Sequence, residues 1–419
     1  MKRWKVFFAC SLALIMIFQA GCSSSKTSSE DVVTLSFWDF HSESQKDFFA
    51  DLVKEYNASQ DNVKIEFKSF NQSDYGTTKL PVAFANGEGP DIFMVNPGDF
   101  LKFADAGILA DLNPYFPEGV KEDFLPASIE AVTYEDKVLA LPYELELLAL
   151  FYNKDMLADA GVEVPKTWDE LSSAAEKLTT DEVAGLILPT DKATYLNFIW
   201  YPFLWQQGGS VLTEDKTASN FDSPEVVKAL DYWGSFFQEG SSPAKLQRGP
   251  WEIGHVGEET AAMQIVGTWD VPALEREFPD VNVGVAPIPI PEGGKQATAA
   301  GGYKFAVNSK SEHVEEAAKF VMWAFGDEDT SHALEWCTDV KFAYSPRKSV
   351  IEAGQETYNS GLQKVFTDEI YETAIPEPSF NAKTVDIIGT ALQEVMFGDV
   401  SGEDAAKKAH EKINESLGN

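Results

Sequence analysis

The chain has 419 residues, with 33 basic and 67 acidic side chains and a formal net charge of −34 at pH 7. A surface this acidic repels the phosphates of nucleic acids and of anionic lipid headgroups, so neither is expected as a partner. An anionic ligand is also disfavoured, although a local Lys or Arg could outweigh the overall field. Aromatic residues make up 12% of the chain, which suits a large core or a site that stacks on rings.

The first 21 residues have the layout of a secretory signal, because a basic start precedes an uncharged, mostly apolar run from Val6 to Phe18. This run is too short for a comfortable transmembrane span. Cys22, preceded by small residues and followed by serines, resembles the lipobox of bacterial lipoproteins, in which the Cys receives a diacylglycerol and the chain is cut before it. Gln19 stands where that motif usually has Leu. We expect a lipid anchor at Cys22; the alternative is an ordinary signal peptide with a chance Cys.

The cysteines predict no disulfide in the mature chain. Cys10 would leave with the signal and Cys22 would be lipidated, so Cys337 would remain alone. Beside Trp336 it is most simply a small core residue. No Cys/His spacing typical of zinc occurs, so neither a metal nor another cofactor is expected.

Residues 22–31 are polar and predict a flexible tether, after which strands and helices alternate. Strands are predicted at 33–37, 63–67 and 91–95, and helices at 45–56, 78–85 and 100–106. Such alternation is typical of a mainly parallel sheet with helices on both faces, so the fold class is α/β.

The rest of the chain is more helical. Helices are predicted at 168–178, 195–207, 224–237, 312–325 and 385–397, and strands at 262–266, 281–286 and 303–307. Thr167 and Glu170 form a capping box at the start of the first of these helices. A mature chain of this length is expected to form two lobes, with a ligand cleft where the carboxyl ends of the strands face each other.

Four motifs occur in order: GPDI at 89–92 with FADAGILADL at 103–112, LPYELE at 141–146 with PKTWDEL at 165–171, AMQIVGTW at 262–269, and GGY at 301–303 before a helix. Together they resemble the bacterial extracellular solute-binding proteins, a family that includes maltose-binding protein. The resemblance runs along almost the whole mature chain. It implies a two-lobed periplasmic-binding-protein fold (type II-like) without enzymatic activity. It also implies capture of a sugar by a monomer for a membrane permease pair of an ABC importer, which a cytosolic ATPase powers.

The resemblance also implies that the chain crosses between the lobes more than once. The N-terminal lobe would hold 31–142 and 302–327, and the C-terminal lobe 143–301 and 328–419. Pro142 fixes a backbone angle, whereas Gly301 and Gly302 can absorb large dihedral changes, which suits a hinge. Simple turns are the alternative at each glycine.

A sugar site needs aromatic rings for the flat C–H faces and carboxylates or amides for the hydroxyls. The resemblance implies Glu146 as the carboxylate that binds ligand and Trp269 as the stacking ring. Glu144 would share a face with Glu146 if the segment is extended. Asp270, beside the Trp, could bond the rim of the sugar.

Some further candidates lie in the loops after the first three strands, where the carboxyl ends of parallel strands meet at one edge of the sheet. Each alone is more often a solvated residue or a helix cap. Tyr201, four residues before Trp205, is by default a core residue. Arg347 offers a planar fork for hydroxyls or for an anion. The further candidates are His41, Ser42, Glu43, Asn71, Gln72, Asn96, Tyr201, Gly302, Tyr303 and Arg347.

Two other functions compete with sugar capture. A secreted glycoside hydrolase could use Glu144 and Glu146, but such enzymes usually mount their two carboxyls on different strands. The same fold could instead bind a polyol, an amino-sugar conjugate or glycerol phosphate, which would be favoured if Arg347 and a Lys line the cleft.

Overall fold

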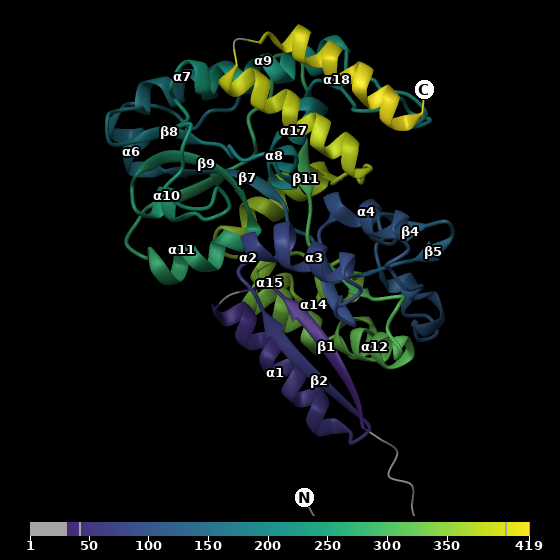
Figure 1. The fold of residues 1–419 in the computed structure, drawn as a ribbon. Coiled ribbons are helices and arrows are strands. Elements are labelled where there is room, and N and C mark those ends of the chain that lie inside the picture. Colours follow the sequence, from purple (N-terminus) through teal and green to yellow (C-terminus); the bar gives the residue numbers. More distant parts are fainter. Residues whose placement is uncertain (1–31, 42, 399, 419) are drawn as a thin grey trace, which may run out of the picture.

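The structure is a computed structural model that describes residues 32–41, 43–398 and 400–418. The predicted signal peptide, the tether with Cys22, and Ser42 lie outside the described residues. Figure 1 shows two lobes, one around β1 and β2 with α1 and α12, the other around β7, β8 and β9 with α7, α17 and α18.

The first lobe is built on a five-stranded sheet in the order β2-β1-β3-β12-β6. Its strands are β1 (Val33–Asp39), β2 (Val63–Ser69), β3 (Ile92–Val95), β6 (Leu141–Pro142) and β12 (Lys304–Val307). β1 runs parallel to β2 and β3, whereas β12 runs antiparallel to β3 and β6 because it returns the chain from the second lobe.

Helices α1 (Glu43–Ser59), α3 (Leu80–Ala85), α4 (Phe100–Asp105) and α12 (Val314–Val321) accompany this sheet. Phe37 on β1 is fully buried, with its ring 5.8 Å from that of Phe49 on α1 and 6.0 Å from that of Phe320 on α12. The alternation of buried and exposed side chains along β1 therefore points its apolar face toward these two helices.

The second lobe has a four-stranded sheet in the order β10-β7-β9-β8. The strands are β7 (Leu148–Asn153), β8 (Ala184–Ile187), β9 (Ala261–Gly267) and β10 (Val283–Ala286). Only β8 and β9 pair in parallel, since β7 runs antiparallel to both of its neighbours. The expected mainly parallel order therefore does not hold in this lobe: β7 brings the chain in from the first lobe and so enters in the opposite direction.

Five long helices cover the second sheet: α7 (Trp168–Leu178), α8 (Thr194–Gln206), α9 (Pro224–Gln238), α17 (Ala382–Phe397) and α18 (Gly402–Leu417). The capping box is confirmed, because Thr167 and Glu170 exchange both side-chain hydrogen bonds with the backbone. Helix α8 is buried nearly all round, as its run of apolar residues requires.

The remaining elements are short. They are α2 (Gln72–Asp74), α5 (Pro126–Glu130), β4 (Thr133–Tyr134), β5 (Lys137–Val138), α6 (Lys154–Asp159), α10 (Gly254–Gly257), α11 (Val271–Glu277), β11 (Thr298–Ala300), α13 (Ser331–Glu335), α14 (Lys348–Ala353), α15 (Gln355–Tyr358), α16 (Gln363–Val365) and β13 (Ala374–Pro376).

Three segments cross between the two lobes side by side. We call them the first crossing segment, around Leu145, the second, around Gly301, and the third, around Tyr344. The main chain of Leu145 exchanges hydrogen bonds of 2.7 and 2.9 Å with that of Tyr344, and the N–H of Gly301 donates to the carbonyl of Glu146 over 2.8 Å. Gly302 has φ +102°, and a Cβ there would lie 2.5 Å from the carbonyl oxygen of Glu144. A side chain is thus excluded where the crossing segments meet.

The predicted lobe boundaries remain a prediction. Part of the segment from 328 onward, which was assigned to the C-terminal lobe, packs against the first lobe. Trp336, just after α13, packs its ring 4.8 Å from Phe49 of α1 in the first lobe. The third crossing segment therefore contributes to the core of the first lobe before it reaches Tyr344.

Candidate functional site

Glu146 lies on the first crossing segment and is 7% exposed. Its Oε1 is 3.0 Å from Nζ of Lys341, and within the described residues no hydrogen bond of normal geometry reaches this oxygen. Burial raises the pKa of Glu146 to about 7, although the nearby Lys341 ammonium acts in the opposite direction and the charge of Glu144 adds to the rise. Glu146 thus keeps acceptor capacity in a place that water barely reaches.

Asp270 ends the 3-10 turn that follows β9 and is 6% exposed. Its Oδ2 has no hydrogen-bond partner among the residues that the structure covers. Burial raises the pKa of Asp270 well above its ordinary value, while a backbone hydrogen bond from Ile253 and the charge of Lys341 oppose the rise. The Lys341 ammonium therefore pairs with Glu146 and, at longer range, its charge also acts on Asp270.

Three aromatic rings stand beside these carboxyl groups. Trp269 donates its indole N–H to the carbonyl of Trp251 over 2.9 Å, and the ring of Tyr195 lies 6.3 Å from Trp269 and 6.0 Å from Trp251. Burial is the main cause that raises the pKa of Tyr195 well above its ordinary value. The charges of Asp270 and Glu146 add to the rise, so the Tyr195 hydroxyl lies near both carboxyl groups. All three aromatic residues keep partial exposure.

Gly267, two residues before Trp269, makes room for the indole ring. A Cβ at Gly267 would lie 1.9 Å from that ring, so only a glycine allows the ring to fold back over the end of β9. Rings next to carboxyl groups with open acceptor positions are what the stacking and hydroxyl binding of a sugar require.

On the side of the first lobe, Tyr303 and Gln72 face the same region. The ring of Tyr303 lies 4.2 Å from that of Phe40, and its hydroxyl bonds to the side chain of Gln72. Gln72 and Asn71 are exposed after β2, as expected for loop residues at the carboxyl end of a strand. Gly302 contributes only backbone here.

His41 is a core residue in this structure. It is 3% exposed, its Nδ1 lies 2.6 Å from Oδ1 of Asp39, and its ring packs against Phe40, Phe49 and Trp336. Its Nε2 is buried and has no hydrogen-bond partner among the described residues. The side chain of Glu43 and all of Ser42 lie outside what the structure describes.

Four candidates have other tasks. Glu144 is fully buried and both oxygens accept protein hydrogen bonds, from the N–H of Tyr303 at 2.8 Å and the indole of Trp336 at 2.9 Å. Asn96 caps the turn Pro97–Asp99 by accepting from the N–H of Asp99 at 2.9 Å. In this conformation both side chains are structural.

Arg347 is also structural, since its Nε donates to Asp123 over 2.8 Å and one terminal nitrogen donates to the carbonyls of Phe325 and Asp327. The guanidinium is therefore used within the fold and does not face the site. Tyr201 is 2% exposed and stacks on Trp205 at 5.5 Å, which agrees with core packing.

Sequence reasoning missed three residues of the site: Lys341, Trp251 and Tyr195. Tyr195 opens the aromatic run of α8 and Trp251 follows a Gly-Pro turn, so both carried a weak aromatic signal. Lys341 carried none, because its partner Glu146 is distant in sequence and only the fold joins them.

The lobes also touch at a second place. Ser379 donates its hydroxyl to the carbonyl of Pro97 over 2.9 Å. A Cβ at Gly98 would lie 2.9 Å from Oε1 of Glu377 and 3.0 Å from a side-chain carbon of Thr194. The turn after β3 of the first lobe therefore lies against the second lobe.

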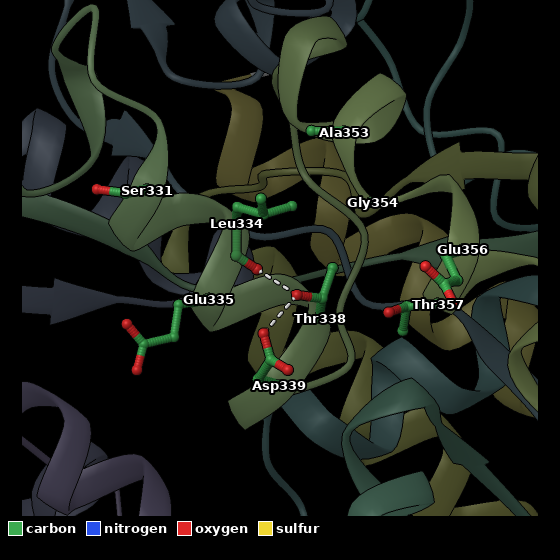
Figure 2. Close-up of a pocket in the computed structure, with 9 residues that line it drawn as sticks. All are labelled: Ser331, Leu334, Glu335, Thr338, Asp339, Ala353, Gly354, Glu356 and Thr357. Carbon is green, nitrogen blue, oxygen red and sulfur yellow. Dashed lines mark hydrogen bonds between the residues drawn. The ribbon is translucent and has the colours of Figure 1, made fainter.

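A separate surface hollow of about 310 Å³ lies between α13 and α14–α15. Figure 2 shows Thr338 bonded to the carbonyl of Leu334 and to Asp339, with Glu335 and Glu356 on the walls. The hollow is not part of the crossing region. In the described part of the chain, no group of three or more His, Cys, Asp or Glu side chains is arranged to hold a metal ion. Among the described helices none is long and apolar enough to cross a membrane.

Comparisons with known proteins agree on the class of the molecule. The model of the bacterial extracellular solute-binding protein family matches residues 42–330. An arabinooligosaccharide-binding protein of Bacillus subtilis strain 168 is 28% identical over 351 residues, 80% of this chain and 79% of the relative.

Two solved structures share the fold. The cyclic alpha-maltosyl-1,6-maltose binding protein of Arthrobacter globiformis has a TM-score of 0.73 and 28% identity, over 92% of this chain and 99% of that one. An ABC transporter solute-binding protein of Thermotoga lettingae TMO, bound with alpha-D-tagatose, has a TM-score of 0.78 and 25% identity, over 92% and 100%. The expected two-lobed α/β fold is thereby confirmed, and the chain belongs to the bacterial extracellular solute-binding protein family.

Proposed function

We propose that this protein captures a neutral sugar, a mono- or oligosaccharide, between its lobes and delivers it to the membrane permease of an ABC importer. The observation that carries the proposal is the pair of buried carboxyl groups, Glu146 and Asp270, each with an oxygen that lacks a hydrogen-bond partner of normal geometry among the described residues. Both charges act on Tyr195, whose ring lies 6.3 Å from that of Trp269 and 6.0 Å from that of Trp251. The sugar-binding names of the relatives support the same ligand class.

In this proposal the sugar stacks on Trp269 and donates hydroxyl hydrogen bonds to Oε1 of Glu146 and Oδ2 of Asp270. Charge-assisted bonds of this kind are stronger than neutral ones. Tyr303 and Gln72 of the first lobe bind the far side of the sugar. Because the ligand then contacts both lobes, it favours the form in which they approach each other.

We further propose that the protein acts as a monomer held on the outer face of the cell membrane by a lipid on Cys22. The support is the lipobox-like sequence around that residue. A Cys22→Ser variant expressed in a bacterial host is expected to leave the membrane fraction, and its retention there would contradict the anchor.

Two alternative functions lose support from the geometry. A hydrolase that uses Glu144 and Glu146 would need both carboxyl groups free, but Glu144 is held by Tyr303 and Trp336. An anion site built on Arg347 would need a guanidinium that Asp123 already binds.

Thermal-shift screening against mono- and oligosaccharides tests the function, because only a ligand that prefers the folded state raises the melting temperature. We expect at least one sugar to do so, and Glu146→Gln to raise its Kd about tenfold or more. Glu335→Gln, which changes an exposed carboxylate, is the matched control. A shift with glycerol phosphate and with no sugar would overturn the proposal, as would hydrolysis of a glycoside that Glu146→Gln abolishes.

A further inference from the structure

Lys341 connects the first crossing segment to the first lobe through one ammonium group. Its side chain is 7% exposed, and its Nζ lies 3.0 Å from Oε1 of Glu146 on the first crossing segment. The same Nζ lies 3.5 Å from Oε1 of Gln45, on α1 of the first lobe. The ammonium also stands 5.9 Å from the ring centre of Trp336. A long, flexible side chain is thus held in one place by contacts from three directions.

The charges around Lys341 are unbalanced toward the acidic side. Glu144, Glu146 and Asp270 all act on it, and Lys304 is the other cation that acts on Glu146. The hydroxyls of Tyr143, Tyr195 and Tyr303 feel the charge of Glu146 as well. Removing Lys341 would therefore take from three buried carboxyl groups a cation that acts on each of them.

The direction of the pKa changes agrees with this geometry. Burial alone would lower the pKa of Lys341, but the charges of Glu146, Glu144 and Asp270 outweigh burial and raise it. Lys341 therefore stays protonated across the physiological range. Its charge opposes the rise that burial causes in the pKa of both Glu146 and Asp270.

We propose that Lys341 is a positioning residue of the ligand site, which holds Glu146 ionised and in place between the lobes and thereby sets the affinity for a neutral sugar and its dependence on pH. The inference rests on the proposed function, since it assumes that Glu146 accepts hydroxyl hydrogen bonds. It assigns Lys341 no contact with the sugar, because its ammonium is already shared by Glu146 and Gln45.

A pH profile of binding follows. Since the pKa of Glu146 is raised to about 7, the fraction of ionised Glu146 grows as the pH rises from 6 to 8. The Kd for the sugar is therefore expected to fall over that interval and to level off above it. Without Lys341 the pKa of Glu146 rises further, because the opposing positive charge is gone, and the fall in Kd moves to higher pH.

The test measures the Kd of maltotriose and of arabinotriose by calorimetry between pH 6 and pH 9 in four proteins: wild type, Lys341→Met, Lys341→Arg and Lys319→Met. Lys319 is the control, because it is an exposed lysine that pairs with Glu315 at the other end of the first lobe. We expect Lys341→Met to bind roughly tenfold more weakly at pH 7 with a profile displaced to higher pH, since one unit of pKa corresponds to a factor of ten. Lys341→Arg should keep the wild-type midpoint, and Lys319→Met should match wild type throughout.

The outcomes separate the two proposals. If the wild type binds neither sugar nor any other saccharide of the panel, the proposed function and this inference fall together. If the wild type binds but Lys341→Met shows the same Kd and the same midpoint, only the role of Lys341 falls.

If Lys341→Met alone fails to fold, the double variant Lys341→Met/Glu146→Gln tests the proposal in its place, because it removes both charges of the pair. We expect it to fold and to bind weakly, with a Kd that falls less between pH 6 and pH 8 than in wild type, because Glu146 no longer titrates and Asp270 is the remaining ligand carboxyl group that can. A double variant that keeps the wild-type profile would overturn the proposal.

Discussion

Trp336 donates its indole N–H to Oε2 of Glu144 over 2.9 Å, and this bond joins the third crossing segment to the first. The other oxygen of Glu144 accepts the main-chain N–H of Tyr303, next to Gly302 of the second crossing. One fully buried carboxylate therefore holds all three connections between the lobes. Glu146, two residues later, has an oxygen that the described residues leave without a hydrogen bond of normal geometry.

This difference predicts opposite results for the two carboxylates. In Glu144→Gln an amide N–H₂ replaces one acceptor and faces a donor, so we expect unfolding to become easier by about 1–3 kcal/mol. Urea unfolding measures this loss. Glu146→Gln should change the unfolding free energy less and the sugar affinity more. If Glu144→Gln weakened sugar binding and left the unfolding free energy unchanged, Glu144 would have to bind the sugar directly, which contradicts the structural role given to it here.

The contact between Gly267 and Trp269 gives a second prediction. In Gly267→Ala the new methyl group would collide with the indole ring, which must then turn away from the end of β9. Sugar affinity should fall by about as much as in Trp269→Ala, roughly tenfold to a hundredfold, although the ring is still present. Calorimetry measures the affinity, and tryptophan fluorescence reports the displaced ring. Gly293→Ala controls for the loss of a glycine: nothing lies within 4 Å of its added methyl group, and its φ of +73° makes it costly to the backbone, so its stability should fall while its sugar affinity stays unchanged. Unchanged affinity in Gly267→Ala would contradict the placement of Trp269 in the site.

The pair of Arg347 and Asp123 predicts a stability effect in place of a binding effect. Arg347→Met takes the guanidinium donor from Asp123, which keeps its bonds from Ser349, and from the carbonyls of Phe325 and Asp327. We expect a loss of about 2–3 kcal/mol, below the value for wholly buried pairs because the side chain of Asp123 is 20% exposed. Lys348→Met, which alters an exposed neighbour, should cost little. Lower sugar affinity at unchanged stability would return Arg347 to the ligand site.

The same pair has a pH signature. Partial burial opposes the charge of Asp123, but hydrogen bonds from Ser349 and Arg347 outweigh burial and lower its pKa below the ordinary 3.8. A lowered folded-state pKa contributes stability that is present above the unfolded value and is lost as the pH falls through the folded value. The stability difference between wild type and Asp123→Asn should therefore be constant from pH 7 to about 5 and shrink below pH 3.8. Urea midpoints measured down the pH scale test this, and a constant difference would contradict it.

Local signals in the sequence predicted the elements well. The strand at Val33, the capping box of Thr167 and the buried helix that contains Tyr201 depend on neighbours in sequence, so periodicity and cap residues are sufficient to find them. The placement of Trp269 after a glycine at a strand end was also local. Its neighbours Trp251 and Tyr195 were not predicted as site residues, since a loop brings Trp251 there and Tyr195 comes from the start of α8, which is distant in sequence.

Sequence reasoning was weakest where charged groups meet across the fold. Glu144 and Glu146 were expected to share a face if their segment is extended; it lies between β6 and β7 and is joined to its neighbours by isolated bridges at Leu145 and Leu147. Which carboxylate is satisfied depends on Trp336 and Lys341 in a distant segment. Arg347 likewise finds Asp123 through tertiary packing that no spacing reveals.

The contact between the lobes at Glu377 gives the last prediction. Burial raises the pKa of Glu377 to about 8, with Lys304 opposing the rise and Asp99 adding to it. Burial also lowers the pKa of Lys304 to about 8, although Glu144, Glu377 and Glu146 act against that change. Both groups therefore approach neutrality near the pH at which the protein would work.

For a carboxyl group whose folded-state pKa is above the ordinary 4.5, the folded protein binds more protons than the unfolded chain between pH 4.5 and about 8. Stability then falls as the pH rises through this window. Glu377→Gln removes that penalty, so its melting temperature should match wild type near pH 4.5 and exceed it by about 1–3 °C at pH 8. Glu372→Gln, on the exposed side of the same segment, should show no such trend. Scanning calorimetry at several pH values decides the matter: a melting-temperature difference that stays flat, or that decreases with pH, would mean that the carboxyl group of Glu377 is solvated and that the lobes do not rest against each other at Pro97 and Gly98 in solution.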